Sequence, residues 1–322
     1  MLGRFVGGTF IFVGAAARSC RPEAKENSAK FTGRFGEKEN EMGMVDGKVA
    51  IVTGATSGIG TRTVEVLIEE GARVVFTGRR AEEGQAIAAR LGPTAVFVQA
   101  DATSESDWRR VGETTMERFG RIDCLFNNAG GPAPTGSITS VSVEGFDDAM
   151  ALLVRSVMLG MKHTAPVMMA QRTGSIINNA SVAAHLAGYS SSMIYGAAKA
   201  AVLHLTRCAA MELGEHNVRV NSVSPGAIAT GILLKALGLD ARAADSRAES
   251  MKEGFAKAQP IPRAGVPDDI AQCVVWLASD RASFINGTDI IVDGGMIGGR
   301  MYTPHQESLK QMRTALQVPT QS

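Results

Sequence analysis

Short apolar, β-branched runs alternate with longer helix-like segments from Lys48 to Val292. The runs are apolar throughout, as in Val49-Ala50-Ile51-Val52, which is typical of strands buried on both faces. Strands separated by helices pair in parallel, because each strand is followed by a helical crossover. The alternation therefore predicts an α/β fold: a single doubly wound, Rossmann-type domain with a mostly parallel, seven-stranded sheet flanked by helices.

The pattern sets approximate bounds for each element. Strands are expected at 48–53, 73–77, 94–98, 122–127, 174–179, 218–223 and 288–292. Helices are expected at 59–70, 81–91, 104–119, 144–170, 193–213 and 268–278. Gly231 to Pro262 forms an Ala-rich, partly helical insertion, and insertions beyond strand ends often act as lids.

The two ends of the chain differ from the domain at 44–296. Residues 1–43 combine a short apolar stretch with a polar run, which indicates a disordered leader or a mis-assigned start. Organelle targeting or export are the alternatives, although the apolar stretch is too short to span a bilayer. In the tail, 297–322, Leu309, Met312 and Leu316 recur at helical spacing and predict a short amphipathic helix. Docking of that helix on a neighbouring subunit and a frayed tail both stay open.

Composition excludes several classes of partner. The formal net charge is +1 and there is no basic tract, which argues against nucleic acid. The four cysteines lie far apart without a CxxC pair, so we expect neither disulfides nor a metal site. Free thiols suit a reducing compartment, and we expect a cytoplasmic protein without a membrane partner.

A glycine-rich turn follows the first expected strand. Gly54, Gly58 and Gly60 allow a tight turn and close backbone approach to a pyrophosphate, and the helix that begins near Gly58 directs free N–H groups at it. Similar turns also join strands to helices without any ligand. The position after a buried strand favours dinucleotide binding. The expected cofactor ligands in this turn are Gly54, Thr56, Ser57, Gly58, Ile59 and Gly60.

Tyr195 and Lys199 are four residues apart in an expected helix and so share one face. A nearby ammonium favours the phenolate and would lower the pKa of Tyr195 toward a value useful for acid–base catalysis. Ser181, just beyond the fifth strand, could polarise a reacting oxygen by hydrogen bonding. Alone, this pair also fits an ordinary helix with a surface tyrosine and lysine.

Five motifs occur in a fixed order: Gly54-x3-Gly58-Ile59-Gly60, Asn127-Asn128-Ala129-Gly130, Ser181, Tyr195-x3-Lys199 and Pro225-Gly226. This combination resembles the short-chain dehydrogenase/reductase family, in its branch with TGxxxGIG and YxxxK motifs. The resemblance runs from about Val45 to Gly295.

The resemblance implies roles for individual residues. Tyr195 would be the general acid/base, Lys199 would lower its pKa and hold the nicotinamide ribose, and Ser181 would orient the substrate oxygen. Further cofactor contacts would come from Asp101, Ala102, Asn128, Ala129, Gly130, Pro225, Gly226, Ile228 and Thr230.

The implied function is NAD(P)-dependent interconversion of a secondary alcohol, cyclic alcohols included, and a ketone. The alternatives are a 3-oxoacyl-thioester reductase and a catalytically weak NAD(P)-binding sensor. The expected partner is a small molecule, and family members commonly assemble as homotetramers or homodimers.

One position departs from the family pattern. The family usually places an asparagine on the fourth helix to hold a water that connects the lysine to solvent. Here that position is Leu153, whose side chain cannot hydrogen-bond. Ser156 is a candidate replacement.

The end of the second strand bears on cofactor choice. Relatives that prefer NAD usually carry an acidic residue where Gly78 stands. Arg79 and Arg80 follow, and either could pair with a 2′-phosphate. NADP(H) is therefore favoured, with NAD(H) as the alternative.

The substrate pocket is expected between the strand ends, the stretch after Ser181 and the insertion at Gly231–Pro262. His185 and Leu186 lie in that stretch, and His185 is a candidate substrate contact. Apolar residues of the insertion favour an apolar pocket, without selecting a substrate.

Overall fold

The computed structural model describes residues 43–318, which belong to one compact unit, so the leader expected at 1–43 lies almost wholly outside them. All seven expected strands are present, and every pair of neighbours is parallel. They are β1 (Val49–Val52), β2 (Arg73–Gly78), β3 (Ala95–Gln99), β4 (Cys124–Asn127), β5 (Gly174–Asn179), β6 (Val218–Pro225) and β7 (Asp289–Val292). Their order is β3-β2-β1-β4-β5-β6-β7, so the direction of winding reverses between β1 and β4. Ligands of such sheets bind at this reversal, beyond the carboxyl ends of the strands.

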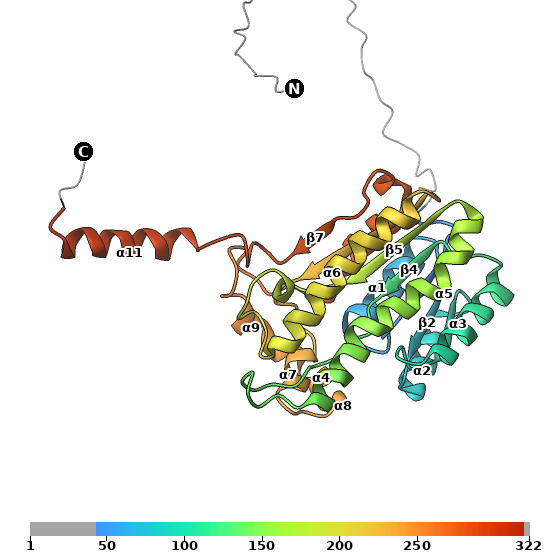
Figure 1. Cartoon of the computed structure of the whole chain (residues 1–322), viewed down its shortest axis with the longest axis horizontal. Helices are drawn as coiled ribbons and strands as arrows, with labels where there is room; N and C mark the ends of the chain where they lie inside the picture. The colour runs from blue at the N-terminus through green and yellow to red at the C-terminus, as the bar shows by residue number, and fades with distance from the viewer. Residues whose placement is uncertain (1–42, 319–322) are drawn as a thin grey trace, which may run out of the picture. The chain divides into compact units, whose positions relative to one another are not determined.

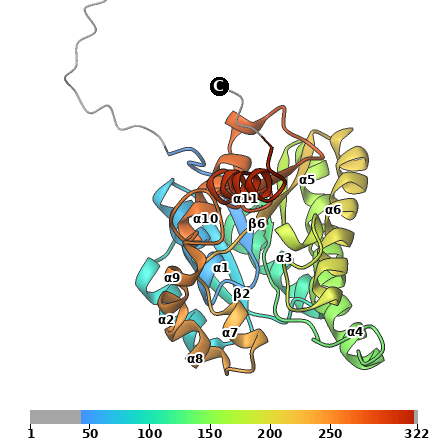
Figure 2. The ribbon, with the colours of Figure 1, turned by 90° about the vertical axis from the view of Figure 1, so that its left-hand side faces the viewer.

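The expected helices are also present, with small changes at their ends (Figure 1). Those flanking the sheet are α1 (Gly58–Glu69), α2 (Ala81–Leu91), α3 (Glu105–Phe119), α4 (Val143–Met150), α5 (Ser156–Gln171), α6 (Met193–Gly214) and α10 (Pro267–Ala278). In Figure 2, α1 and α10 lie on one side of the sheet, and α3, α5 and α6 on the other.

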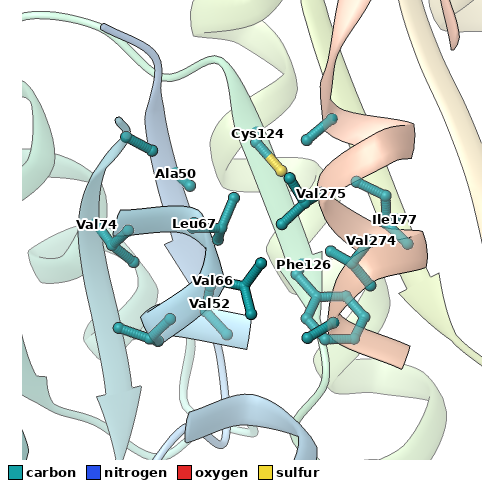
Figure 3. Packing of buried hydrophobic residues seen from close by; sticks show 14 of the residues in the cluster. Ala50, Val52, Val66, Leu67, Val74, Cys124, Phe126, Ile177, Val274 and Val275 are labelled. Atoms are coloured by element: carbon teal, nitrogen blue, oxygen red, sulfur yellow. The ribbon is translucent and has the colours of Figure 1, made fainter. Parts of the chain in front are cut away.

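The core follows from strands that alternate between two apolar faces. On β1, Ala50 and Val52 pack under α1 and α10, whereas Ile51 points to the opposite face. Figure 3 shows Val66 and Leu67 of α1 meeting Val274 and Val275 of α10 over these strands. Because both faces are covered, continuous apolar runs mark the strands in the sequence.

The helix expected at 144–170 is one continuous rod with an irregular turn inside it. Between α4 and α5, Ala151–Arg155 forms a π-helical turn (η1), in which Ser156 N–H donates to the carbonyl of Ala151. Such turns hold one extra residue and often occur at functional sites. Leu153 in this turn is buried against Ile194 and Ala198 of α6.

The insertion Gly231–Pro262, which we call the lid segment, is helical as expected. It contains α7 (Ile232–Ala236), α8 (Ala241–Ser246), a 3₁₀ turn η3 (Ala248–Met251) and α9 (Lys252–Phe255). Few of its residues are buried, with Ala244 and Gln259 the clearest exceptions. The lid segment is therefore held mainly by polar contacts.

The tail helix expected around Leu309–Leu316 is α11 (Tyr302–Ala315), and none of its residues is buried. Figure 1 shows it extended away from the sheet. No helix within residues 43–318 is both long and apolar enough to cross a membrane.

Candidate active site

The glycine turn between β1 and α1 has the geometry that its sequence predicts. Gly54 and Gly58 have φ values of +62° and +58°, a region that side chains disfavour. A Cβ on Gly54 would lie 2.7 Å from the Cα of Ala129, and one on Gly60 would lie 2.6 Å from the carbonyl oxygen of Gly54. The Ser57 side chain does not cap α1, so the first N–H groups of that helix are left to other acceptors. A pyrophosphate fits this turn.

Asn128 fixes the turn from the neighbouring strand. Its Nδ2 donates to the carbonyls of Thr53 (2.9 Å) and Gly54 (3.1 Å). In return, Thr53 Oγ1 accepts from the backbone N–H groups of Asn128 (3.0 Å) and Ala129 (2.9 Å). These bonds tie the ends of β1 and β4 together at the winding reversal.

Asn179, at the end of β5, extends this network to Lys199. Its Nδ2 donates to Asn128 Oδ1 over 3.1 Å, and its backbone carbonyl accepts from Lys199 Nζ over 2.5 Å. Its own Oδ1 is buried without a partner among the described residues. Such an atom is costly to leave unpaired and fits a donor from a bound dinucleotide. We call Thr53–Gly60, Asn128, Asn179 and Lys199 the site floor.

Sequence analysis missed Asn179. The available signal was its position: it ends β5, Asn128 directly follows β4, and carboxyl ends of parallel strands meet at one edge of the sheet.

Ser181, Tyr195 and Lys199 are brought together as expected. Ser181 N-caps the short 3₁₀ turn η2 (Val182–Ala184), where its Oγ accepts from Ala183 N–H. Tyr195 and Lys199 lie one turn apart on α6, and Lys199 Nζ is 5.7 Å from the centroid of the Tyr195 ring. The start of α6 is set by Ser192, whose Oγ accepts from Tyr195 N–H and donates to the carbonyl of Pro134.

The expected lowering of the Tyr195 pKa by Lys199 is not found. Burial raises the pKa of Tyr195 to about 12, opposed by hydrogen bonding with Ser181. Burial also lowers the pKa of Lys199 to about 8, since only 4% of its surface is exposed. The low polarity of the site outweighs the charge of the lysine, because Nζ donates to Asn179 rather than to the phenol.

One pocket runs from the glycine turn to Tyr195. Most of the predicted cofactor ligands line it: Gly54, Ser57, Gly58, Ile59, Asn128, Gly130, Tyr195, Lys199, Pro225, Gly226, Ile228 and Thr230. Gly60 and Ala129 lie behind this surface and shape the turn. Lys235 and Asp245 of the lid segment line the same pocket, and no local sequence pattern marks them.

Thr56, Arg79 and Arg80 lie at the corner between the glycine turn and β2. Arg80 is already engaged: it donates to Thr56 Oγ1 (3.2 Å) and the Thr56 carbonyl (3.1 Å), and pairs with Asp245 (3.0 Å). Arg79 is exposed and has no carboxylate within 4.0 Å among the described residues. Of the two arginines, Arg79 is thus the one free to meet a ligand.

Asp101 and Ala102 follow β3 and do not line the pocket. Asp101 Oδ1 accepts from the N–H and hydroxyl of Thr103, and Ala102 accepts from the indole of Trp108. Both residues, expected as cofactor contacts, brace the loop after β3.

Leu153 and Ser156 are the two residues at which a proton route near Lys199 was considered, and neither side chain offers a free polar atom. Leu153 is 1% exposed and packs beside Tyr195. Ser156 is also buried, and its Oγ donates to the carbonyl of Leu152 over 2.6 Å, one turn back in the helix. The hypothesis that Ser156 replaces the missing asparagine therefore finds no support in the geometry.

A second, mainly apolar pocket adjoins Ser181 and Tyr195. It is lined by Val182, Tyr189 and the lid residues Ile232, Leu233, Ala236 and Phe255, among others. The structure does not support the hypothesis that His185 contacts substrate. Its Nε2 pairs with Asp289 Oδ2 on β7 at 2.8 Å, and neither His185 nor Leu186 lines the pocket.

Comparisons with known proteins agree with this geometry. A family described as "Enoyl-(Acyl carrier protein) reductase" matches residues 54–297. The chain is 38% identical over 255 residues to momilactone A synthase of Oryza sativa subsp. japonica, covering 78% of this chain and 90% of that protein. It is 38% identical over 255 residues to 2,5-dichloro-2,5-cyclohexadiene-1,4-diol dehydrogenase of Sphingobium indicum, covering 79% and 98%. It is 38% identical over 253 residues to (+)-borneol dehydrogenase 2 of Salvia officinalis, covering 77% and 89%.

Proposed function

The chain belongs to the short-chain dehydrogenase/reductase family, and we propose that it interconverts an apolar, ring-bearing secondary alcohol and its ketone with NAD(P). The observation that carries the proposal is the convergence of Ser181, Tyr195 and Lys199 where the cofactor pocket meets the apolar pocket.

Each of these side chains has a distinct part in the proposed reaction. The nicotinamide, when bound, accepts or supplies the hydride. Tyr195 transfers the proton to or from the substrate oxygen, and Ser181 holds that oxygen by hydrogen bonding. Lys199, which Asn179 holds in place, favours the ionised form of Tyr195 once it is drawn toward the phenol. Moving Lys199 away from Asn179 would lower the pKa of Tyr195 from its raised value.

The lining of the second pocket supports an apolar substrate. Aliphatic and aromatic side chains from the lid segment face Tyr195, and charged side chains are absent from the lining that the described residues form. Two relatives are named as dehydrogenases of ring alcohols, borneol and a chlorinated cyclohexadienediol. An apolar alicyclic alcohol therefore fits better than a sugar or a charged thioester.

Replacing Tyr195 tests the proposal. With a panel of cyclic secondary alcohols and ketones, we expect Tyr195→Phe to lower kcat about 10³-fold, because the variant lacks the transferable proton. The affinity for the dinucleotide should stay within about twofold, which fluorescence titration measures. Tyr302→Phe, on the exposed helix α11, is the matched control. Equal turnover by Tyr195→Phe would refute the assignment.

We propose NADP(H) as the preferred cofactor, with NAD(H) as the alternative. A side chain on Gly78 would meet the methyl of Thr56 at 2.6 Å, so a carboxylate does not fit there without movement. Arg79 is free to pair with a 2′-phosphate. We expect Arg79→Asp to lower the kcat/KM ratio of NADP over NAD at least tenfold while the NAD values stay constant. A strong preference of the unmodified protein for NAD would exclude this choice.

A thioester reductase and a cofactor-binding sensor are distinguished by the same assays. The description of the matching family concerns acyl-carrier substrates, so acetoacetyl thioesters belong in the substrate panel. Turnover of thioesters alone would favour the reductase. Tight dinucleotide binding without any turnover would favour the sensor.

We also propose a cytoplasmic homo-oligomer, a tetramer or a dimer. The exposed face of α6 carries Ala197, Ala200 and Met211, small or apolar residues that suit pairing of two helices across a two-fold axis. Free thiols at Cys124, Cys208 and Cys273 suit a reducing compartment. Light scattering of the purified protein measures its mass, and a monomer would rule out the assembly.

A further inference from the structure

One carboxylate of the lid segment reaches the cofactor pocket. Asp245, at the end of α8, places one oxygen 3.0 Å from Arg80 Nη1 and the other 2.8 Å from Lys235 Nζ. All three side chains are only 23–25% exposed. Gly231 leaves room for this carboxylate, because a Cβ there would meet Asp245 Oδ1 at 2.4 Å. The contact therefore joins α8, α7 and the end of β2.

The two cations stand at the glycine turn. Asp245 and Lys235 line the same pocket as Ser57, Gly58 and Thr230. Arg80 is anchored there by its two hydrogen bonds to Thr56. This is the corner of a doubly wound fold that receives the phosphates and the adenosine ribose of a dinucleotide.

The carboxylate is bound as an anionic ligand would be. Burial disfavours its charge, yet hydrogen bonds and attraction from Lys235 and Arg80, with a contribution from Ser57, hold the pKa of Asp245 below its usual value. Asp245 is thus ionised near neutral pH. Carboxylate and phosphate oxygens use the same arginine and lysine donors, so the two groups compete for one position.

We propose that Asp245 is an internal stand-in for a phosphate group of the dinucleotide. Before the cofactor binds, its carboxylate occupies the anion position formed by Arg80 and Lys235 and holds the lid segment to the glycine turn. When the cofactor binds, its phosphate displaces Asp245 and takes over these donors. The inference rests on the proposed function. A resident competitor lowers the apparent affinity, because the intrinsic affinity is multiplied by the fraction of time that the position is free.

Removing the competing charge should tighten cofactor binding. Asp245→Asn keeps the shape of the side chain, and we expect its Kd for the preferred dinucleotide to fall about three- to tenfold, measured by fluorescence titration of NADPH and NADH. Glu249→Gln is the matched control, since it makes the same charge change in the lid segment at a side chain whose ion-pair partner among residues 43–318 is Lys252 alone. An unchanged or higher Kd for Asp245→Asn overturns the proposal.

Fragments distinguish which phosphate competes. If only NADPH and 2′,5′-ADP bind more tightly to Asp245→Asn, the competing group is the 2′-phosphate. If NADH and ADP gain as much, it is the pyrophosphate.

Limited proteolysis tests the lid contact without any cofactor or turnover. In the ligand-free protein, we expect trypsin to cleave after Lys235, Arg242 and Arg247 several times faster in Asp245→Asn than in the unmodified protein or Glu249→Gln. Equal rates would show that Asp245 does not hold the lid segment and would overturn the proposal. An unmodified protein that binds neither dinucleotide would instead contradict the proposed function, and with it the phosphate assignment, whatever the proteolysis shows.

Discussion

The site floor and the lid segment enclose the same pocket but are held in opposite ways. The floor consists of strand ends joined by hydrogen bonds of backbone, threonine and asparagine groups, as between Thr53 and Asn128. The lid segment has few buried residues and reaches its neighbours through charged side chains such as Arg242 and Asp245. Close backbone approach cannot be adjusted without cost, whereas exposed ion pairs exchange partners easily. The floor therefore suits a fixed ligand geometry, and the lid segment suits entry and release.

The largest expected effect concerns the buried charge of the floor. Burial lowers the pKa of Lys199 from 10.5 to about 8, so between these pH values the unfolded chain binds a proton that the folded chain lacks. Stability then rises with pH. Relative to Lys199→Met, the free energy of unfolding of the unmodified protein should increase by about 3 kcal/mol from pH 8 to pH 10.5. Urea denaturation across this range measures it. A flat or falling difference would contradict the burial of the ammonium.

A methyl group in the floor should be costly. In Gly54→Ala the new Cβ meets the Ala129 backbone at 2.7 Å, and the residue keeps a φ that alanine disfavours. We expect a loss of about 1–3 kcal/mol of stability and at least tenfold weaker dinucleotide binding. Thermal denaturation and fluorescence titration give the two values. Unaltered dinucleotide binding would show that the cofactor does not need close approach to the backbone of the glycine turn.

A glycine-to-alanine substitution in the lid segment should have the opposite effect on stability. Gly254 lies in α9, and a Cβ there meets no atom within 4 Å. Gly254→Ala should stabilise the protein by about 0.5 kcal/mol, because alanine loses less backbone entropy in a helix, and should leave cofactor affinity unchanged. A destabilised variant would mean that Gly254 is as closely packed as the glycines of the site floor.

The smallest effect is expected for the outer contact of the lid segment. Arg242 is 71% exposed and pairs with Glu82 and Glu83 on α2. Exposed pairs contribute little, so Arg242→Ala should leave Tm and cofactor Kd within error. A clear fall in either would show that surface charge, in addition to Asp245, holds the lid segment.

Features set by local patterns could be predicted from the sequence, and those set by tertiary contacts could not. The apolar runs located all seven strands, with β5 correct at both ends. The glycine turn and the grouping of Ser181, Tyr195 and Lys199 also followed. The π turn was missed because a local change from i→i+4 to i→i+5 hydrogen bonding leaves no mark in the pattern of residue types. Asp245 and Lys235 escaped notice because only the fold of the lid segment brings them to the glycine turn. The pKa of Tyr195 differed from expectation because burial depends on the whole surrounding structure.

The extra residue in the π turn also rotates α5 relative to α4 about their common helix axis. Successive residues of an α-helix are rotated by about 100°, so one additional residue turns everything beyond it by about that angle. Ala149 and Leu153 pack in the cluster that contains Tyr195, while Val157 and Met161, beyond the π turn, pack in the cluster under the sheet. One continuous helical segment thereby contacts two neighbours, the start of α6 on one side of the π turn and the sheet on the other.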